Sequence, residues 1–126
     1  MLIQCKSPFL FFCDVPNHRE IKKYYYPLIL DSFKKINDAP PPGWNCSVKT
    51  TFNYPLVLLR ENLLLNAIVW NPLDQMLKEA NLNLYPKKSN VDRIWANLYE
   101  KMSFQEVHNH VTPHSLIHFS GIYIID

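Results

Sequence analysis

Apolar side chains recur every three or four residues after Pro16, and this spacing predicts the first helix. Asn17 is expected to cap it, with Glu20 three residues later as the capping-box partner. Pro27 is expected to kink or split the helix, which should end before Asp38. The recurring positions are Ile21, Tyr25, Leu28 or Ile29, Ser32 or Phe33, and Ile36.

A second helical region is expected in the middle of the chain. The longest apolar stretch is broken by polar residues, so it predicts a buried helix over 56–69 rather than a membrane span. Asn71 then has the features of a new helix cap, because Pro72 at the first helical position favours a fresh start. This next helix should end near Asn81.

Other segments have the composition of strands. Residues 8–15 and 46–52 are rich in aromatic and branched side chains. Apolar and polar residues alternate over 91–99, and shorter strands are expected over 106–110 and 117–125. In the last of these, one face should carry Phe119, Gly121, Tyr123 and Ile125. Because helices come first and antiparallel strands last, the expected fold class is α+β.

Size and composition indicate one folded domain over residues 1–126. Apolar residues make up 48% of the 126 and charged residues 19%, which is typical of a globular protein. The net charge of +2 comes without a long basic run, so no nucleic-acid partner is indicated. Three cysteines without a Cys-x-x-Cys spacing favour free thiols in a reducing compartment. We therefore expect a cytoplasmic protein with no membrane partner.

Four of the five histidines lie in the stretch FQEVHNHVTPHSLIHFSG, residues 104–121. On a strand, His108 and His110 point to the same face and can share one metal ion, as in the facial triads of non-heme iron sites. A helical zinc site through the later histidines is disfavoured by Pro113. Exposed loop histidines are the alternative that the residues alone leave open. His18, alone in the first turn of a helix, is expected at the plain surface.

The residues around this stretch resemble a known family. Trp95-Ala-Asn97-Leu-Tyr99-Glu-Lys101-Met-Ser-Phe104-Gln-Glu-Val-His108-Asn-His110, followed by Ser120-Gly121-Ile-Tyr123, is similar to iron(II)/2-oxoglutarate-dependent oxygenases of bacteria and tailed phages. Their pattern is Trp-x-Asn-x-Tyr-x-Lys-Gly-Asp-Tyr-Gln-x-x-His-x-His-Pro, then Ser-Gly-x-Tyr-Tyr. The similarity is distinctive over 95–123 and looser before it.

The resemblance implies a double-stranded β-helix (jelly-roll) that starts within residues 91–126, behind an N-terminal part of helices and strands in residues 1–90. It implies Fe(II) and 2-oxoglutarate as cofactors and the oxidation of an unactivated carbon on an unknown small-molecule or protein substrate. His108 would be the first metal ligand, and His110 stands where relatives carry an aspartate ligand. Asn97 and Tyr99 would line the 2-oxoglutarate pocket, or else pack as ordinary strand positions.

The sequence departs from the family pattern in four respects. Met102-Ser103 replaces the usual Gly-Asp turn, Val111 replaces a proline, and extra residues lengthen the loop over 112–118. The family also continues past its Ser-Gly-x-Tyr-Tyr motif, so the jelly-roll is expected to be incomplete and to lack its third metal ligand and its 2-oxoglutarate-binding arginine. The open edge at Ile122–Ile125 would then invite a second copy or a partner chain.

Two other functions are compatible with the sequence. One is a non-catalytic structural or interaction protein derived from the same fold, with its free edge strand as the contact. The other is a small histidine-rich protein that binds a different metal through His108, His110 and either His114 or His118. A stable oligomer without metal dependence would favour the interaction protein over an oxygenase. Elemental analysis of the bound metal would distinguish the histidine-rich protein from an oxygenase.

Overall fold

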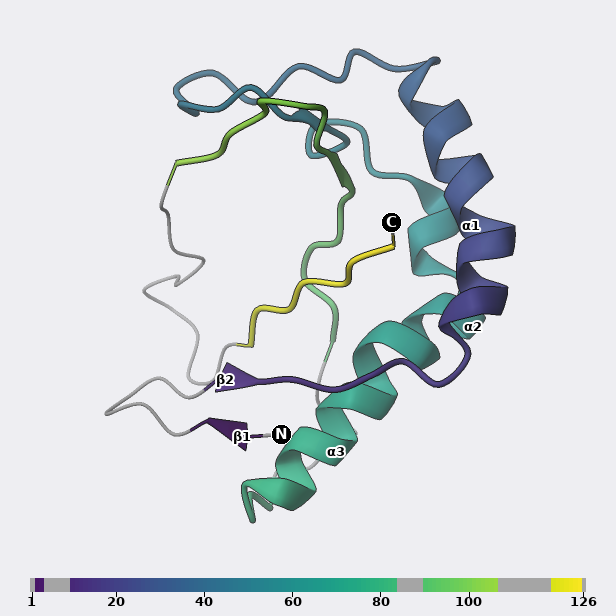
Figure 1. Cartoon of the computed structure of the whole chain (residues 1–126), viewed down its shortest axis with the longest axis vertical. Helices are drawn as coiled ribbons and strands as arrows, with labels where there is room; N and C mark the ends of the chain where they lie inside the picture. The colour runs from purple at the N-terminus through teal and green to yellow at the C-terminus, as the bar shows by residue number, and fades with distance from the viewer. Residues whose placement is uncertain (1, 4–9, 84–89, 107–118, 126) are drawn as a thin grey trace.

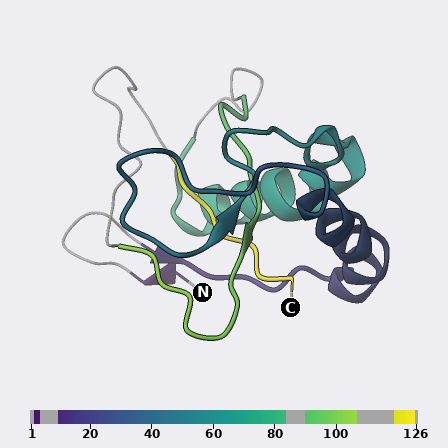
Figure 2. The ribbon, with the colours of Figure 1, turned by 90° about the horizontal axis from the view of Figure 1, so that it is seen from above.

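The computed structural model describes residues 2–3, 10–83, 90–106 and 119–125 and has an α+β fold (Figure 1). The helices gather along one side of the molecule and the extended segments lie on the other (Figures 1 and 2). In chain order the elements are β1 (Leu2–Ile3), β2 (Leu10–Phe11), α1 (His18–Phe33), β3 (Lys49–Thr50), the 3₁₀ turn η1 (Val57–Arg60), α2 (Asn62–Leu65), the π turn η2 (Asn66–Trp70), α3 (Asn71–Glu79) and β4 (Asn97–Leu98).

Helix α1 buries one face because its largest apolar residues are spaced four apart. This buried face carries Ile21, Tyr25, Ile29 and Phe33, as the spacing predicts. Pro27 does not split the helix. It lies on the exposed side, where water can hydrogen-bond the backbone carbonyl that a proline leaves without a partner.

The N-terminus of α1 differs from the prediction, whereas its C-terminus agrees with it. Asn17 is the N-cap residue, but its side chain makes no capping bond, so the predicted capping box is not formed. Its backbone oxygen instead accepts a hydrogen bond from the Ile21 N–H at 3.1 Å. The helix ends at Phe33, several residues before Asp38.

The middle helical region begins later than predicted and does not break at Asn71. Glu61 is extended, with φ −62° and ψ 134°, so the α-helix starts at Asn62 rather than near Leu56. Helix α2, the π turn η2 and α3 then follow without a gap. Asn71 is helical and donates its backbone N–H to the Asn66 oxygen, five residues back. This wider π turn directly precedes Pro72, which has no N–H to continue the α-helical ladder.

The core lies between the buried face of α1 and the middle helices. Leu59, Leu64 and Ala67 complete it from the second helical region. Partly buried apolar side chains pack against it: Val15, Leu56, Leu58, Ile68, Ile94, Ala96, Leu98, Tyr123 and Ile125. Ala96 and Leu98 thus both face the core, as the alternation over 91–99 predicts. Within the described residues, no helix has the length and apolar character needed to cross a membrane.

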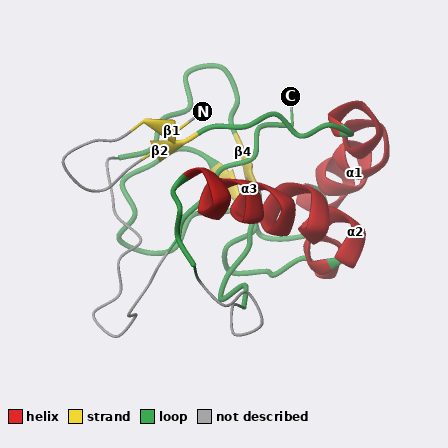
Figure 3. Ribbon diagram, turned by 90° about the horizontal axis from the view of Figure 1, so that it is seen from below, coloured by secondary structure: helices red, strands yellow, loops and turns green. Residues whose placement is uncertain are grey.

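Two pairs of short strands form antiparallel sheets, β1 with β2 and β3 with β4 (Figure 3). In the second pair Lys49 lies opposite Leu98 and Thr50 opposite Asn97. The pairing extends beyond the strands, since the Thr51 N–H donates to the Ala96 oxygen at 3.0 Å and Cys46 bridges to Gln105. The predicted strands therefore pair through residues 49–51 and 96–98, and residues 46–47 pair with the segment 104–105 that follows the turn.

The predicted C-terminal strand is not formed in its described part, Phe119–Ile125, which has no strand partner among the described residues. The alternation of its side chains is nevertheless present. Tyr123 and Ile125 pack against the core, whereas Ile122 is 94% exposed. His18 Nδ1 and the Tyr123 hydroxyl are hydrogen-bonded at 2.8 Å, so the expectation that His18 is plain surface is wrong.

Candidate functional site

The predicted metal ligands, His108 and His110, lie outside the described residues, as do His114 and His118. Across ranges 2–3, 10–83, 90–106 and 119–125, no three His, Cys, Asp or Glu side chains lie together as a metal site would require. Of the predicted site residues, the structure therefore places Asn97 and Tyr99.

Asn97 lies on β4, opposite Thr50 of β3. Its neighbours Ala96 and Leu98 pack against the core, so strand geometry directs Asn97 to the opposite face. Its Oδ1 atom is buried and has no hydrogen-bond partner among the described residues. A buried acceptor without a donor costs roughly 1–3 kcal/mol, which makes Asn97 a candidate ligand-binding residue.

Tyr99 follows two residues later and is 54% exposed. Its hydroxyl donates a hydrogen bond to Gln105 Oε1 at 2.5 Å. Gln105 is in turn the bridge partner of Cys46. Tyr99 is thus tied across the turn that follows β4, and a ligand of Asn97 would find the Tyr99 hydroxyl already engaged.

The turn at Glu100–Ser103 is held by two hydrogen bonds between its ends. The Ser103 N–H donates to the Glu100 oxygen at 2.9 Å, and the Glu100 N–H donates to Ser103 Oγ at 3.0 Å. Met102, at the third position, has φ +70°, in the left-handed region that favours glycine. It is also the position at which the family pattern has glycine.

Met102→Gly is expected to raise the free energy of unfolding by roughly 0.5–1 kcal/mol, because glycine adopts this φ without the steric cost that other residues meet. Little contact is lost, since Met102 is 87% exposed. Urea denaturation of both proteins measures the difference. Met102→Ala removes the same side chain but keeps the Cβ, so it should give no such gain, and an equal gain in that variant would contradict the strain argument.

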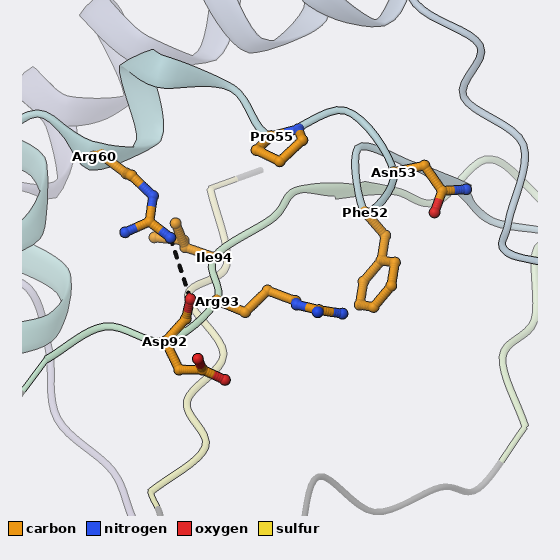
Figure 4. A pocket seen from close by; sticks show the side chains of 7 residues that line it. All are labelled: Phe52, Asn53, Pro55, Arg60, Asp92, Arg93 and Ile94. Atoms are coloured by element: carbon orange, nitrogen blue, oxygen red, sulfur yellow. Dashed lines mark hydrogen bonds between the residues drawn. The ribbon is translucent and has the colours of Figure 1, made fainter.

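A second candidate site, around Phe52, was not predicted from the sequence. Phe52 lies among three aromatic or cationic groups: Trp44 at 4.8 Å and Trp95 at 5.2 Å between ring centroids, and the Arg93 guanidinium 4.4 Å from its ring centroid. A hollow of about 290 Å³ opens beside this cluster (Figure 4). Its lining residues are Phe52, Asn53, Pro55, Arg60, Asp92, Arg93 and Ile94. The sequence did carry one indication of this cluster. In the alternation over 91–99, Arg93 and Trp95 are positions that face away from the core.

Comparison with known proteins adds no assignment. No protein-family model matches the chain, no curated protein matches its sequence, and no solved structure matches its fold.

Proposed function

We propose that this chain belongs to an iron(II)/2-oxoglutarate-dependent oxygenase with a jelly-roll fold. The observation that supports this most directly is the conformation of Met102. The family pattern has a glycine there, and the backbone has the positive φ for which glycine is selected. The motif similarity over 95–123 is thus accompanied by a backbone conformation that suits a glycine at this position.

The chemistry of Asn97 fits a bound carboxylate. As placed, Oδ1 is an acceptor with no donor in the part of the chain that the structure describes. Rotation of the amide by about 180° would exchange it for the Nδ2 group, which carries two donors and can bind a carboxylate oxygen of 2-oxoglutarate. Tyr99 would contribute its hydroxyl after exchanging its bond to Gln105.

His108 and His110 would hold the metal ion in this proposal. With both cofactors bound, O2 would be the oxidant: 2-oxoglutarate would supply two electrons by its conversion to succinate and CO2, and the unactivated carbon of the substrate would supply the other two. The imidazoles must be neutral to bind the metal, so metal binding should weaken as the pH falls.

His108→Ala is expected to weaken iron(II) binding by at least about tenfold. Loss of a residue that merely hydrogen-bonds to a metal ligand typically weakens metal binding about 10- to 100-fold, and His108 would be a ligand itself. Anaerobic equilibrium dialysis followed by elemental analysis measures it. Asn97→Ala should keep iron binding and weaken 2-oxoglutarate binding by roughly tenfold, the loss expected for a charge-assisted hydrogen bond. Succinate formation from 2-oxoglutarate, iron(II), ascorbate and oxygen provides the activity readout.

His114→Ala is the matched control, since the family pattern assigns no role to this histidine. It should bind iron(II) as the unaltered chain does. Loss of metal in both His108→Ala and His114→Ala would favour the histidine-rich metal site instead. Unchanged iron(II) binding in His108→Ala would overturn the proposed function.

A further inference from the structure

The hollow beside Phe52 brings two arginines and one aspartate together without pairing them. Arg60 comes from η1, whereas Asp92 and Arg93 come from the segment that leads into β4 (Figure 4). Within the described part of the chain, Asp92 forms no ion pair with either guanidinium. The Asp92 carboxylate and the two guanidinium groups can therefore each bind a ligand.

Both guanidinium groups are held in position. Arg60 Nη1 donates to the Val91 oxygen and Nη2 to the Asp92 oxygen, each at 3.3 Å. These bonds use two of the five guanidinium N–H donors and leave three. Arg60 can therefore bind a ligand from a fixed orientation, with less rotamer freedom to lose.

Arg93 is held by its contact with an aromatic ring instead. Its guanidinium lies over the ring of Phe52, which is itself packed against Trp44 and Trp95. This contact limits the rotamers that the Arg93 side chain can adopt. No hydrogen bond engages its guanidinium N–H donors among the described residues. A fork of this kind matches the two oxygens of a carboxylate.

The charge and size of the hollow narrow the ligand class. Two guanidinium groups and one carboxylate leave a net charge of +1 in the lining. A volume of about 290 Å³ is at the lower limit for ligand pockets, which span roughly 300–1,000 Å³. Pro55 and Ile94 add an apolar part for a short carbon chain. A small monoanion with one hydrogen-bond donor complements this lining.

We propose that the hollow binds a small hydroxy acid. Its carboxylate would lie against Arg93 and Arg60, and its hydroxyl would donate to the Asp92 carboxylate. This site is separate from the proposed iron and 2-oxoglutarate site, needs no metal, and does not depend on the proposed function.

The test is a titration of the ¹⁵N-labelled chain with lactate, in the presence of a chelator, followed by the amide signals of Asn53 and Ile94. Three further compounds resolve the chemistry: propionate lacks the hydroxyl, alanine replaces it by an ammonium group, and inorganic phosphate replaces the carboxylate. Lactate should bind roughly tenfold more tightly than propionate, since a hydrogen bond to a charged group has about this effect. Equal binding of lactate and propionate, or tighter binding of alanine or phosphate, would overturn the assignment.

Variants locate the ligand. Arg93→Gln and Arg93→Lys should both weaken lactate binding by roughly tenfold, since lysine keeps the charge but not the planar fork. Asp92→Asn should reduce the preference for lactate over propionate. Both side chains are exposed, so the variants should fold, which the dispersion of the amide spectrum checks.

Two control variants complete the design. Arg19→Gln removes an exposed charge elsewhere and should leave lactate binding unchanged. Asn97→Ala should also leave it unchanged, whereas it weakens 2-oxoglutarate binding in the proposed oxygenase. If the amide shifts caused by lactate were lost in Asn97→Ala but kept in Arg93→Gln, the ligand would lie at Asn97. Binding in the hollow would then be refuted. Failure of iron binding would leave the lactate result unaffected.

Discussion

Tyr25→Ala is expected to lower the free energy of unfolding by about 3–5 kcal/mol, the usual loss when a large buried aromatic residue is truncated. Tyr25 is 1% exposed and lies at the centre of the buried face of α1. Its hydroxyl also donates to Glu61 Oε2 at 2.7 Å and thereby joins α1 to the start of α2. Urea denaturation followed by circular dichroism measures the loss.

Two variants separate packing from hydrogen bonding in this prediction. Tyr25→Phe keeps the ring and should cost about 1.5–3 kcal/mol, as expected for a hydrogen bond to a charged partner. Tyr24→Phe removes a hydroxyl from the neighbouring ring, which is 59% exposed, and should cost little. A loss in Tyr24→Phe as large as that in Tyr25→Phe would contradict the role assigned to the Glu61 bond.

The same residue makes stability depend on pH in the alkaline range. Burial, followed by the hydrogen bond to Glu61, raises the pKa of Tyr25 from 10 to about 12. The unfolded chain therefore releases this proton first, and deprotonation favours unfolding. Stability should fall as the pH rises from about 10 to 12, and this fall should be smaller in Tyr25→Phe. Burial raises the pKa of Tyr123 as well, which adds a contribution of the same sign.

Thr51→Val is expected to lower the free energy of unfolding by about 1–3 kcal/mol, although the two side chains have nearly the same shape. Thr51 is fully buried, and its Oγ1 accepts a hydrogen bond from the Ala96 N–H at 2.9 Å. Valine leaves that N–H buried without an acceptor. Equilibrium denaturation gives the loss, and faster hydrogen exchange of the Ala96 amide would assign it to this bond.

Thr51→Ser serves as the matched variant, because it keeps the hydroxyl and removes only a methyl group. It should cost less than Thr51→Val and preserve the exchange protection at Ala96. If serine were the more damaging substitution, packing of the methyl group would be the dominant contribution at this position.

Local periodicity was sufficient to predict the buried faces of single elements. The four-residue spacing of Ile21, Tyr25 and Ile29 identified the face of α1 that packs against the core. Alternation likewise identified the inward positions Ala96 and Leu98. These predictions succeed because a regular backbone directs side chains by its own period, whatever it packs against.

Element boundaries depended on contacts that no local rule contains. Asn71-Pro72 has the composition of a helix start, yet the helix runs through it because a π turn accommodates the proline. Asn17 occupies the cap position without making the side-chain bond that its type favours. A cap preference of about 1 kcal/mol is small enough for the rest of the fold to override it.

The sequence by itself determined the α+β class, the core face of α1 and the alternation on either side of Asn97. Only the tertiary structure decided that residues 46–51 lie along 96–105 and that the Arg93 guanidinium lies over the Phe52 ring. It also decided that Asn97 has a buried oxygen with no donor among the described residues. The physical reason is distance along the chain. Periodicity acts over a few residues, whereas these contacts join segments about 40–60 residues apart, whose pairing is set by the shape and burial of the whole core.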